Sequence, residues 1–230
     1  HFTITAQQIN FPGLDKAFIT DNITVQVADV YSNPVPQGTA VYFNSAHGSM
    51  QTGGGDAGLT DANGFVTKSL YSANPFPVAP NVLSGSTAGF SRVYARTIGK
   101  DSVRVLDSLL ILWTGAPVIA LTGGPAAYAI PNGGSAGPFT FTVLDRLNHP
   151  MSPGTTITAT ADGCTVSGDA NVSMPDTQVG GAGLTSFTVL LNDAAPLIIP
   201  PSPAPSVLTV TVTHPVYGTY KRVLASGTVN

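Results

Sequence analysis

The sequence repeats itself once along its length. The segment DVYSNPVPQGTAVYF at residues 29–43 returns as DRLNHPMSPGTTITA at residues 145–159, so that Asp29 corresponds to Asp145 with an offset of 116 residues. In both copies a glycine, an apolar segment and a proline-rich segment follow, within 63–82 and 182–205. Self-similarity at a fixed period indicates a repeated structural unit, and roughly 115 residues is the size of one domain. The sequence therefore predicts two tandem domains, at residues 1–116 and 117–230.

The amino-acid composition is typical of an all-β protein. Charged residues make up 9% of the chain, against roughly 25% in an average globular protein, and all twelve acidic residues are Asp. Without Glu and with only nine Lys and Arg, the strong helix formers of protein surfaces are scarce. Apolar and polar residues alternate in Ile23–Val27 and Leu208–Thr213, as in strands that bury one face. We therefore expect two immunoglobulin-like Greek-key β-sandwiches of about seven strands each.

Two short motifs in the first copy carry a resemblance to a known family. Asn33–Gly38 reads Asn-Pro-Val-Pro-Gln-Gly, and Thr60–Gly64 reads Thr-Asp-Ala-Asn-Gly. With the repeat, these motifs make the chain resemble the bacterial immunoglobulin-like domains of the invasin and intimin type. The second copy departs from both motifs, with HPMSPG at 149–154 and VGGAG at 179–183. The resemblance covers most of the chain, and it implies the immunoglobulin fold and a secreted or cell-surface, extracellular setting.

Charge and hydropathy disfavour two classes of partner. The net charge is -3 and no basic cluster is present, so neither nucleic acid nor an anionic membrane surface is an expected partner. The longest apolar run, Leu109–Trp113, is too short to be inserted across a membrane. The single cysteine, Cys164, excludes an internal disulfide and is expected to be a small buried residue. A chain that starts at His1 is expected either after removal of a signal peptide or in a fragment of a longer protein.

No motif predicts a catalytic site. Gly133–Gly137 fits the Gly-x-Ser-x-Gly string around Ser135, but a nucleophile elbow needs a helix after the serine, and here Pro138 and a strand are expected. The chain is therefore predicted not to be an enzyme and to need neither a cofactor nor a metal. The histidines lack the spacing of metal ligands and are interpreted as residues of loops or strand ends: His1, His47, His149 and His214.

Calcium binding and glycosylation both stay open at this point. Asp61 and Asn63, with Gly54–Asp56, could place several oxygen atoms near one point, as calcium binding requires. A turn held by hydrogen bonds from side chain to backbone explains the same residues without calcium. The sequons at Asn22 and Asn171 leave glycosylation open in the same way.

The two proline-rich segments are the strongest candidates for contact surfaces. Each is expected between the fifth and sixth strands of its sandwich, at the end where the last strand leaves the domain. Phe76, Pro77 and Val78 are therefore expected to contact the second domain, together with Trp113 at the end of the apolar run. The equivalent apolar residues of the second copy need a further domain or another subunit to cover them: Leu197, Ile198 and Ile199.

The first residues of the chain predict a strand with one apolar face, on which Phe2 and Ile4 lie. This strand either belongs to the first domain itself or is exchanged with an identical subunit, as in donor-strand complementation. In both cases Phe2 and Ile4 are candidate residues for a subunit or partner contact.

The leading interpretation is an extracellular structural or adhesive protein, a rigid tandem rod that serves as a stalk, spacer or filament subunit. The linker 114–117 is too short for free tumbling of the domains. The expected partners are neighbouring immunoglobulin-like domains or identical subunits. The alternative is a non-catalytic module that binds sugar or protein within a larger secreted enzyme or virion, and exposed aromatic residues would be its signature.

Overall fold

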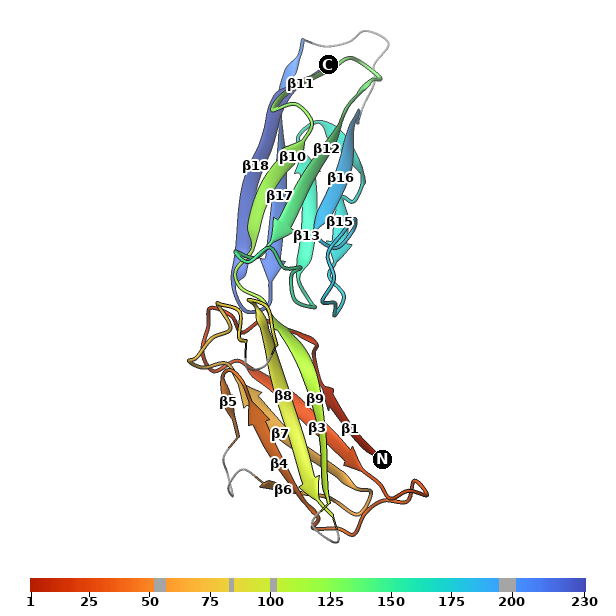
Figure 1. Ribbon diagram of the computed structural model, residues 1–230. Helices are drawn as coiled ribbons and strands as arrows, with labels where there is room; N and C mark the ends of the chain where they lie inside the picture. The colour runs from red at the N-terminus through yellow and green to blue at the C-terminus, as the bar shows by residue number, and fades with distance from the viewer. Residues whose placement is uncertain (52–56, 83–84, 100–102, 195–201) are drawn as a thin grey trace. The chain divides into compact units, whose positions relative to one another are not determined.

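The structure is a computed structural model, shown in Figure 1, and it describes residues 1–51, 57–82, 85–99, 103–194 and 202–230. The chain divides into two compact units, His1–Gly115 and Ala116–Asn230. Both are built of strands and turns, without a helix among the described residues. The predicted fold class, all-β with two tandem immunoglobulin-like Greek-key sandwiches, is confirmed.

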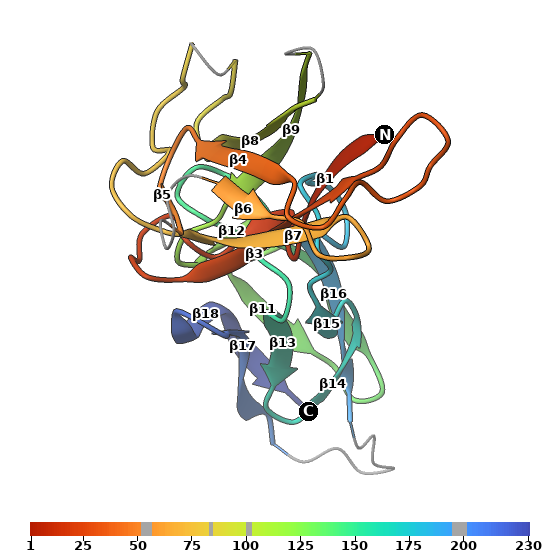
Figure 2. The same ribbon diagram turned by 90° about the horizontal axis from the view of Figure 1, so that it is seen from below.

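The first domain consists of two sheets packed face to face. In Figure 2 the sheet with β4, β8 and β9 forms the upper layer of this domain, and the sheet with β3 and β7 forms the layer beneath it in the picture. One sheet has four strands in the spatial order β1 (Phe2–Ala6), β3 (Thr20–Val27), β7 (Phe65–Tyr71) and β5 (Ser49–Met50). The other has five strands in the order β2 (Asn10–Phe11), β9 (Arg104–Trp113), β8 (Phe90–Ile98), β4 (Ala40–Ser45) and β6 (Ala57–Leu59).

The second domain repeats this topology strand for strand. Its four-stranded sheet has the order β10 (Val118–Gly123), β12 (Ser135–Leu144), β16 (Ser186–Asp193) and β14 (Cys164–Gly168). Its five-stranded sheet has the order β11 (Ala127–Ile130), β18 (Gly218–Val229), β17 (Ala204–His214), β13 (Thr156–Ala161) and β15 (Asn171–Ser173). In the described residues each domain therefore has nine strands, two more than the sequence predicted, because short strands such as β2 and β5 carry no readable alternation.

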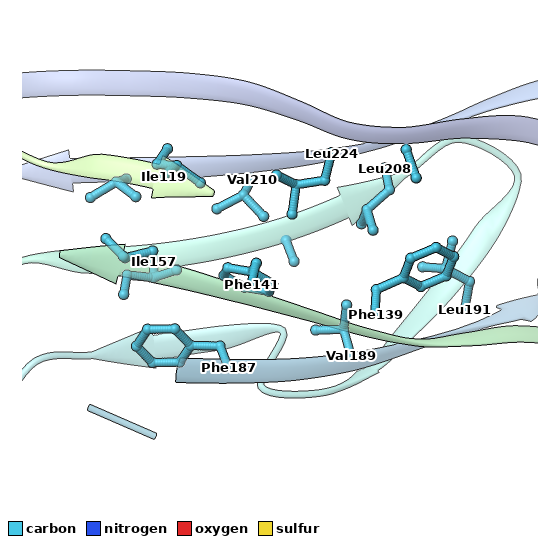
Figure 3. Close-up of a cluster of buried hydrophobic side chains, with 14 of the residues drawn as sticks. Ile119, Phe139, Phe141, Ile157, Phe187, Val189, Leu191, Leu208, Val210 and Leu224 are labelled. Carbon is cyan, nitrogen blue, oxygen red and sulfur yellow. The ribbon is translucent and has the colours of Figure 1, made fainter. Parts of the chain in front are cut away.

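The core of each domain is formed by the inward faces of these strands. In β3 the side chains of Ile23 and Val25 are fully buried, while Asn22 and Gln26 on the opposite face are exposed, as the alternation predicts. Figure 3 shows the core of the second domain, where Phe139, Phe141 and Leu191 extend between the sheets. The Phe141 ring stacks on the ring of Phe187 with 5.5 Å between centroids. Such aromatic pairs add to the stability that burial alone provides.

Three turns, one in each copy of the repeated segment and one more in the first domain, are held by aspartate side chains. In each of three turns, one carboxylate oxygen accepts N–H groups from the second and fourth residues after the aspartate, at 2.8 to 2.9 Å. The third residue after the aspartate has a positive φ of 65 to 77°. These bonds close the turn locally and fix the register of the strands beside it. The three aspartates are Asp29, Asp61 and Asp145.

Among the described residues, each domain also contains one pair of parallel strands, which joins an early strand to the last one. In the first domain, β2 pairs with β9, and Phe11 lies opposite Trp113. In the second domain, β11 pairs with β18 over four residues. A Cβ atom at Gly227 of β18 would collide with the carbonyl oxygen of Tyr128, so this close approach of the two backbones requires glycine.

Candidate functional site

Trp113 and Phe76, both predicted to lie at an interdomain contact, pack on each other within the first domain. The Trp113 side chain is fully buried. Its ring meets the Phe11 ring edge to face at 5.0 Å and the Phe76 ring edge to face at 6.4 Å. Gly48 allows this packing, because a Cβ at that position would lie 2.7 Å from the indole ring. Trp113 is therefore a core residue of its own domain.

The rest of the predicted interdomain segment varies in exposure. Phe76 is half-buried, Pro77 is buried, and 47% of Val78 is exposed. The packing of Phe76 on Trp113 accounts for its burial on one side. Its contact with the second domain stays a prediction, as does that of Pro77 and Val78.

The linker between the domains begins with a residue that is bound into the first domain. Four residues, 114–117, separate the end of β9 from the start of β10. Thr114 is fully buried, and its N–H donates to the carbonyl oxygen of Phe11 at 2.8 Å. Its hydroxyl donates to the side-chain oxygen of Asn10, and its own carbonyl accepts the N–H of Leu14 at 3.1 Å. Three residues are thus left to connect Thr114 to the second domain.

Phe2 and Ile4 lie in β1, which pairs with β3 of the same domain over five residue pairs. Ile4 is 6% exposed, and Phe2 is half-buried. Exchange of this strand with an identical subunit would first have to break these pairs, and the exchange stays a prediction. Leu197, Ile198 and Ile199, the other candidate contact residues, lie outside the described residues.

Deletion of residues 1–8 tests the two roles of this strand. Because β1 supplies a buried side chain and five residue pairs to its own domain, we expect the truncated chain to stay monomeric and its first domain to unfold at a lower temperature. Sedimentation velocity and the fluorescence of Trp113 measure the two effects. Thr3→Ala, on the exposed face of the same strand, is the control. If the parent chain forms fibres and the deletion converts them into fully stable monomers, the result would instead favour strand exchange.

The nucleophile-like string does not form an elbow. Ser135 is the first residue of β12 and lies opposite Asn192 of β16, so a strand follows the serine where an elbow needs a helix. The Asp61 carboxylate, a candidate calcium ligand, holds its own turn by accepting the N–H groups of Asn63 and Phe65. Gly54–Asp56 lie outside the described residues. Within the described part of the chain, no group of three His, Cys, Asp or Glu side chains is arranged to hold a metal.

A buried pair of serine and histidine, which the sequence analysis did not single out, lies in the second domain. Ser152 Oγ is 2.9 Å from His214 Nε2, and both side chains are at most 1% exposed. His214 Nδ1 accepts the N–H groups of Val216 and Tyr217 at 3.0 and 3.2 Å. Because Nδ1 acts as an acceptor, the ring proton is on Nε2, which donates to Ser152. The imidazole therefore cannot take a proton from Ser152 as a general base, and the pair is structural.

Burial sets the protonation state of this histidine. Loss of solvent around the ring lowers the pKa of His214 to about 4. A second histidine, His47 of the first domain, is also buried, and burial lowers its pKa as well. Its Nδ1 lies 3.3 Å from the hydroxyl of Ser91. Both rings are therefore neutral at pH 7.

The outer face of the β4, β8 and β9 sheet forms a groove that the sequence analysis missed. The groove encloses a space of about 560 Å³, and Tyr42, Tyr94 and Arg96 are among its lining residues. The Arg96 guanidinium lies over the Tyr42 ring at 5.4 Å. The sequence held one sign of this groove, the alternation of Arg92, Tyr94 and Arg96 in β8. The residues between them are buried, so these three side chains share the outward face of the strand.

The sequence matches neither a family model nor a curated protein. Solved structures that it resembles include the D0-D1 domain of intimin, with 15% identity over 98% of this chain and 97% of that chain and a TM-score of 0.34. A C-terminal 282-residue fragment of intimin, solved in complex with the intimin-binding domain of the translocated intimin receptor, matches with 16% identity over 99% and 64% of the two chains and a TM-score of 0.42. Domains 4 and 5 of the S-layer protein SbsC match with 16% identity over 100% and 97% and a TM-score of 0.31. The similar structures thus include domains of the intimin type to which the sequence motifs pointed, whereas the fold assignment itself rests on the strand order and register described above.

Proposed function

We propose that this chain is an extracellular structural or adhesive protein whose two domains act together as a stalk, spacer or filament subunit. The observation that carries the proposal is the short connection between two sandwiches of one topology. Thr114 is held inside the first domain by hydrogen bonds, and three residues then lead to the second domain. A connection of this length permits few relative orientations of the domains, as a spacer requires. The resemblance of the repeat motifs to invasin-type and intimin-type domains supports a surface setting.

Lengthening the linker tests this role. We expect small-angle scattering of the parent chain to fit a narrow distribution of maximum dimensions. Insertion of six Gly and Ser residues after Gly115 should broaden that distribution, because the two domains are then joined by a flexible chain. Insertion of the same six residues after Gly181, in an exposed loop of the second domain, is the matched control and should leave it unchanged. Equal breadth in the parent and the linker variant would contradict the spacer role.

We assign no catalytic step to this protein. The Ser152 and His214 pair has its proton on the wrong nitrogen for base catalysis, and Ser135 opens a strand. Both serines can be tested by substitution with alanine, which should change no measured function of the folded chain.

The second candidate function is a non-catalytic binding module. The observation that favours it is the groove over β4, β8 and β9, where two tyrosines and an arginine lie at the surface. Tyrosine and arginine are enriched at binding sites, because each combines a large contact area with polar groups at its end.

A further inference from the structure

The strand register of the first domain gathers a defined set of side chains in this groove. Tyr42 of β4 lies opposite Arg96 of β8, and Arg96 lies opposite Leu106 of β9. In the next row outward-facing residues Asn44, Tyr94 and Ser108 lie opposite one another in the same way. These three strands lie side by side in Figure 1. The two tyrosines are therefore diagonal neighbours on one face, about 7 to 8 Å apart at their Cα atoms.

The groove combines aromatic surface with neutral hydrogen-bonding groups. The Tyr42 and Tyr94 rings supply flat apolar area, and both side chains are only half-buried, although Arg96 lies over one face of the Tyr42 ring. Asn44, Ser45 and Ser49 supply amide and hydroxyl groups that both donate and accept. A ligand that has apolar C–H faces and many hydroxyl groups matches this combination, which is the chemistry of a sugar ring.

The charge on this face points to an anionic ligand. Arg96 lines the groove, and Arg92 and Arg104 lie on the same outward side of the β8 and β9 hairpin, in a chain that has nine Lys and Arg in total. Among the described residues, those that line the groove include no Asp or Glu. The Arg96 guanidinium lies over the Tyr42 ring at 5.4 Å, and its planar fork of N–H groups can pair with a carboxylate in bidentate fashion.

We propose that this groove binds a carboxylated glycan, a chain of uronic acid residues, with sugar rings on Tyr42 and Tyr94 and a carboxylate on Arg96. The proposal deepens the binding-module alternative and does not depend on the spacer role. An acidic peptide is less suited to this surface, because acidic motifs are recognised by clusters of arginines, and Arg96 is the one charged residue among the described residues that line the groove. Here the groove is open and Met50 and Leu106 are its aliphatic lining residues.

The test is titration with alginate hexasaccharide, followed by calorimetry and by NMR chemical shifts. We expect saturable binding that weakens as ionic strength rises, since a carboxylate is held by the exposed Arg96. Arg96→Gln and Tyr94→Ala should each weaken binding about tenfold or more. Arg96→Lys should fall between the parent and Arg96→Gln, because lysine keeps the charge but not the bidentate geometry. The control is Arg146→Gln, at an exposed turn of the second domain, which should bind as the parent does.

Three results would overturn the proposal. The first is no binding of the hexasaccharide at millimolar concentration by a parent chain that is folded. The second is equal affinity for maltohexaose, a neutral glycan, or for poly-aspartate, which would identify a general sugar surface or an anion and peptide surface. The third is unchanged affinity in Arg96→Gln with an unchanged melting temperature. The linker variant should bind the hexasaccharide normally, so a failure here leaves the spacer role to its own test.

Discussion

Acidification from pH 7 to pH 4 should destabilise the second domain by about 3 kcal/mol through one residue, His214. Its pKa is about 4 in the folded chain and about 6.5 in the unfolded chain. Between these values the unfolded state binds more protons than the folded state, so stability falls as the pH falls. The contribution is fully present above pH 6.5, and the loss levels off below about pH 4.

The structure explains why the folded state resists this proton. The ring is 1% exposed, so protonation would place a charge where water is excluded. The added proton would also lie on Nδ1, which faces the N–H groups of Val216 and Tyr217. Both effects oppose the charged form in the folded chain alone.

Two substitutions separate the titration from the packing. His214→Asn keeps an oxygen that can accept the N–H groups of Val216 and Tyr217 but cannot titrate, so the slope of stability against pH should largely disappear. Ser152→Ala removes the partner of Nε2 and should cost about 1 to 3 kcal/mol at every pH while the slope stays. The transition of the second domain can be followed at each pH by calorimetry, with the transition of the first domain as an internal reference. A slope that survives in His214→Asn would show that another group controls the acid response.

Trp113→Ala should destabilise the first domain by about 3 to 5 kcal/mol, the usual cost of truncating a large aromatic residue in a core. The indole is fully buried and contacts two further aromatic rings, so its loss leaves a cavity in the core of the first domain. Calorimetry should show a lower transition temperature for the first domain and an unchanged one for the second.

A matched control is available in the same strand. Leu106 of β9 is 62% exposed, and Leu106→Ala should change the stability of the first domain by about 0.5 kcal/mol or less. Trp113→Phe should fall between the two, because it retains most of the ring and removes an indole N–H that has no hydrogen-bond partner among the described atoms. A Trp113→Ala transition close to that of Leu106→Ala would mean that the indole is not part of the core.

The fold was predictable where local sequence determines it. Ile23, Val25 and their polar neighbours predicted β3 because period-2 alternation reports a strand with one buried face. The Asp29 turn was equally readable, since its hydrogen bonds close within five residues. The two-residue strands β2 and β5 were not, because nothing in so short a segment distinguishes a strand from a turn.

The functional surfaces depend on contacts that are distant in the sequence. The apolar run that ends at Trp113 was evident, but its neighbour Phe11 is about a hundred residues away, so the run was interpreted as part of the domain junction. His214 was interpreted as a turn residue before Pro215, and its burial against Ser152 could not be inferred from that position. The groove needs the order of β4, β8 and β9, which places Tyr42 beside Arg96 only after the sandwich has formed.

The parallel strand pairs also determine how each domain carries mechanical load. When a chain is pulled at its two ends, β2 and β9 are drawn in opposite directions along their common axis, and so are β11 and β18. Their hydrogen bonds are then loaded together, whereas a hairpin opened from its end would lose them one after another. In the first domain the hydrogen bonds of Thr114 to Asn10 and Phe11 continue the β2 and β9 pairing up to the linker. Under tension each domain should stay folded until its parallel strand pair separates. The chain should therefore extend in two separate steps, one for each domain.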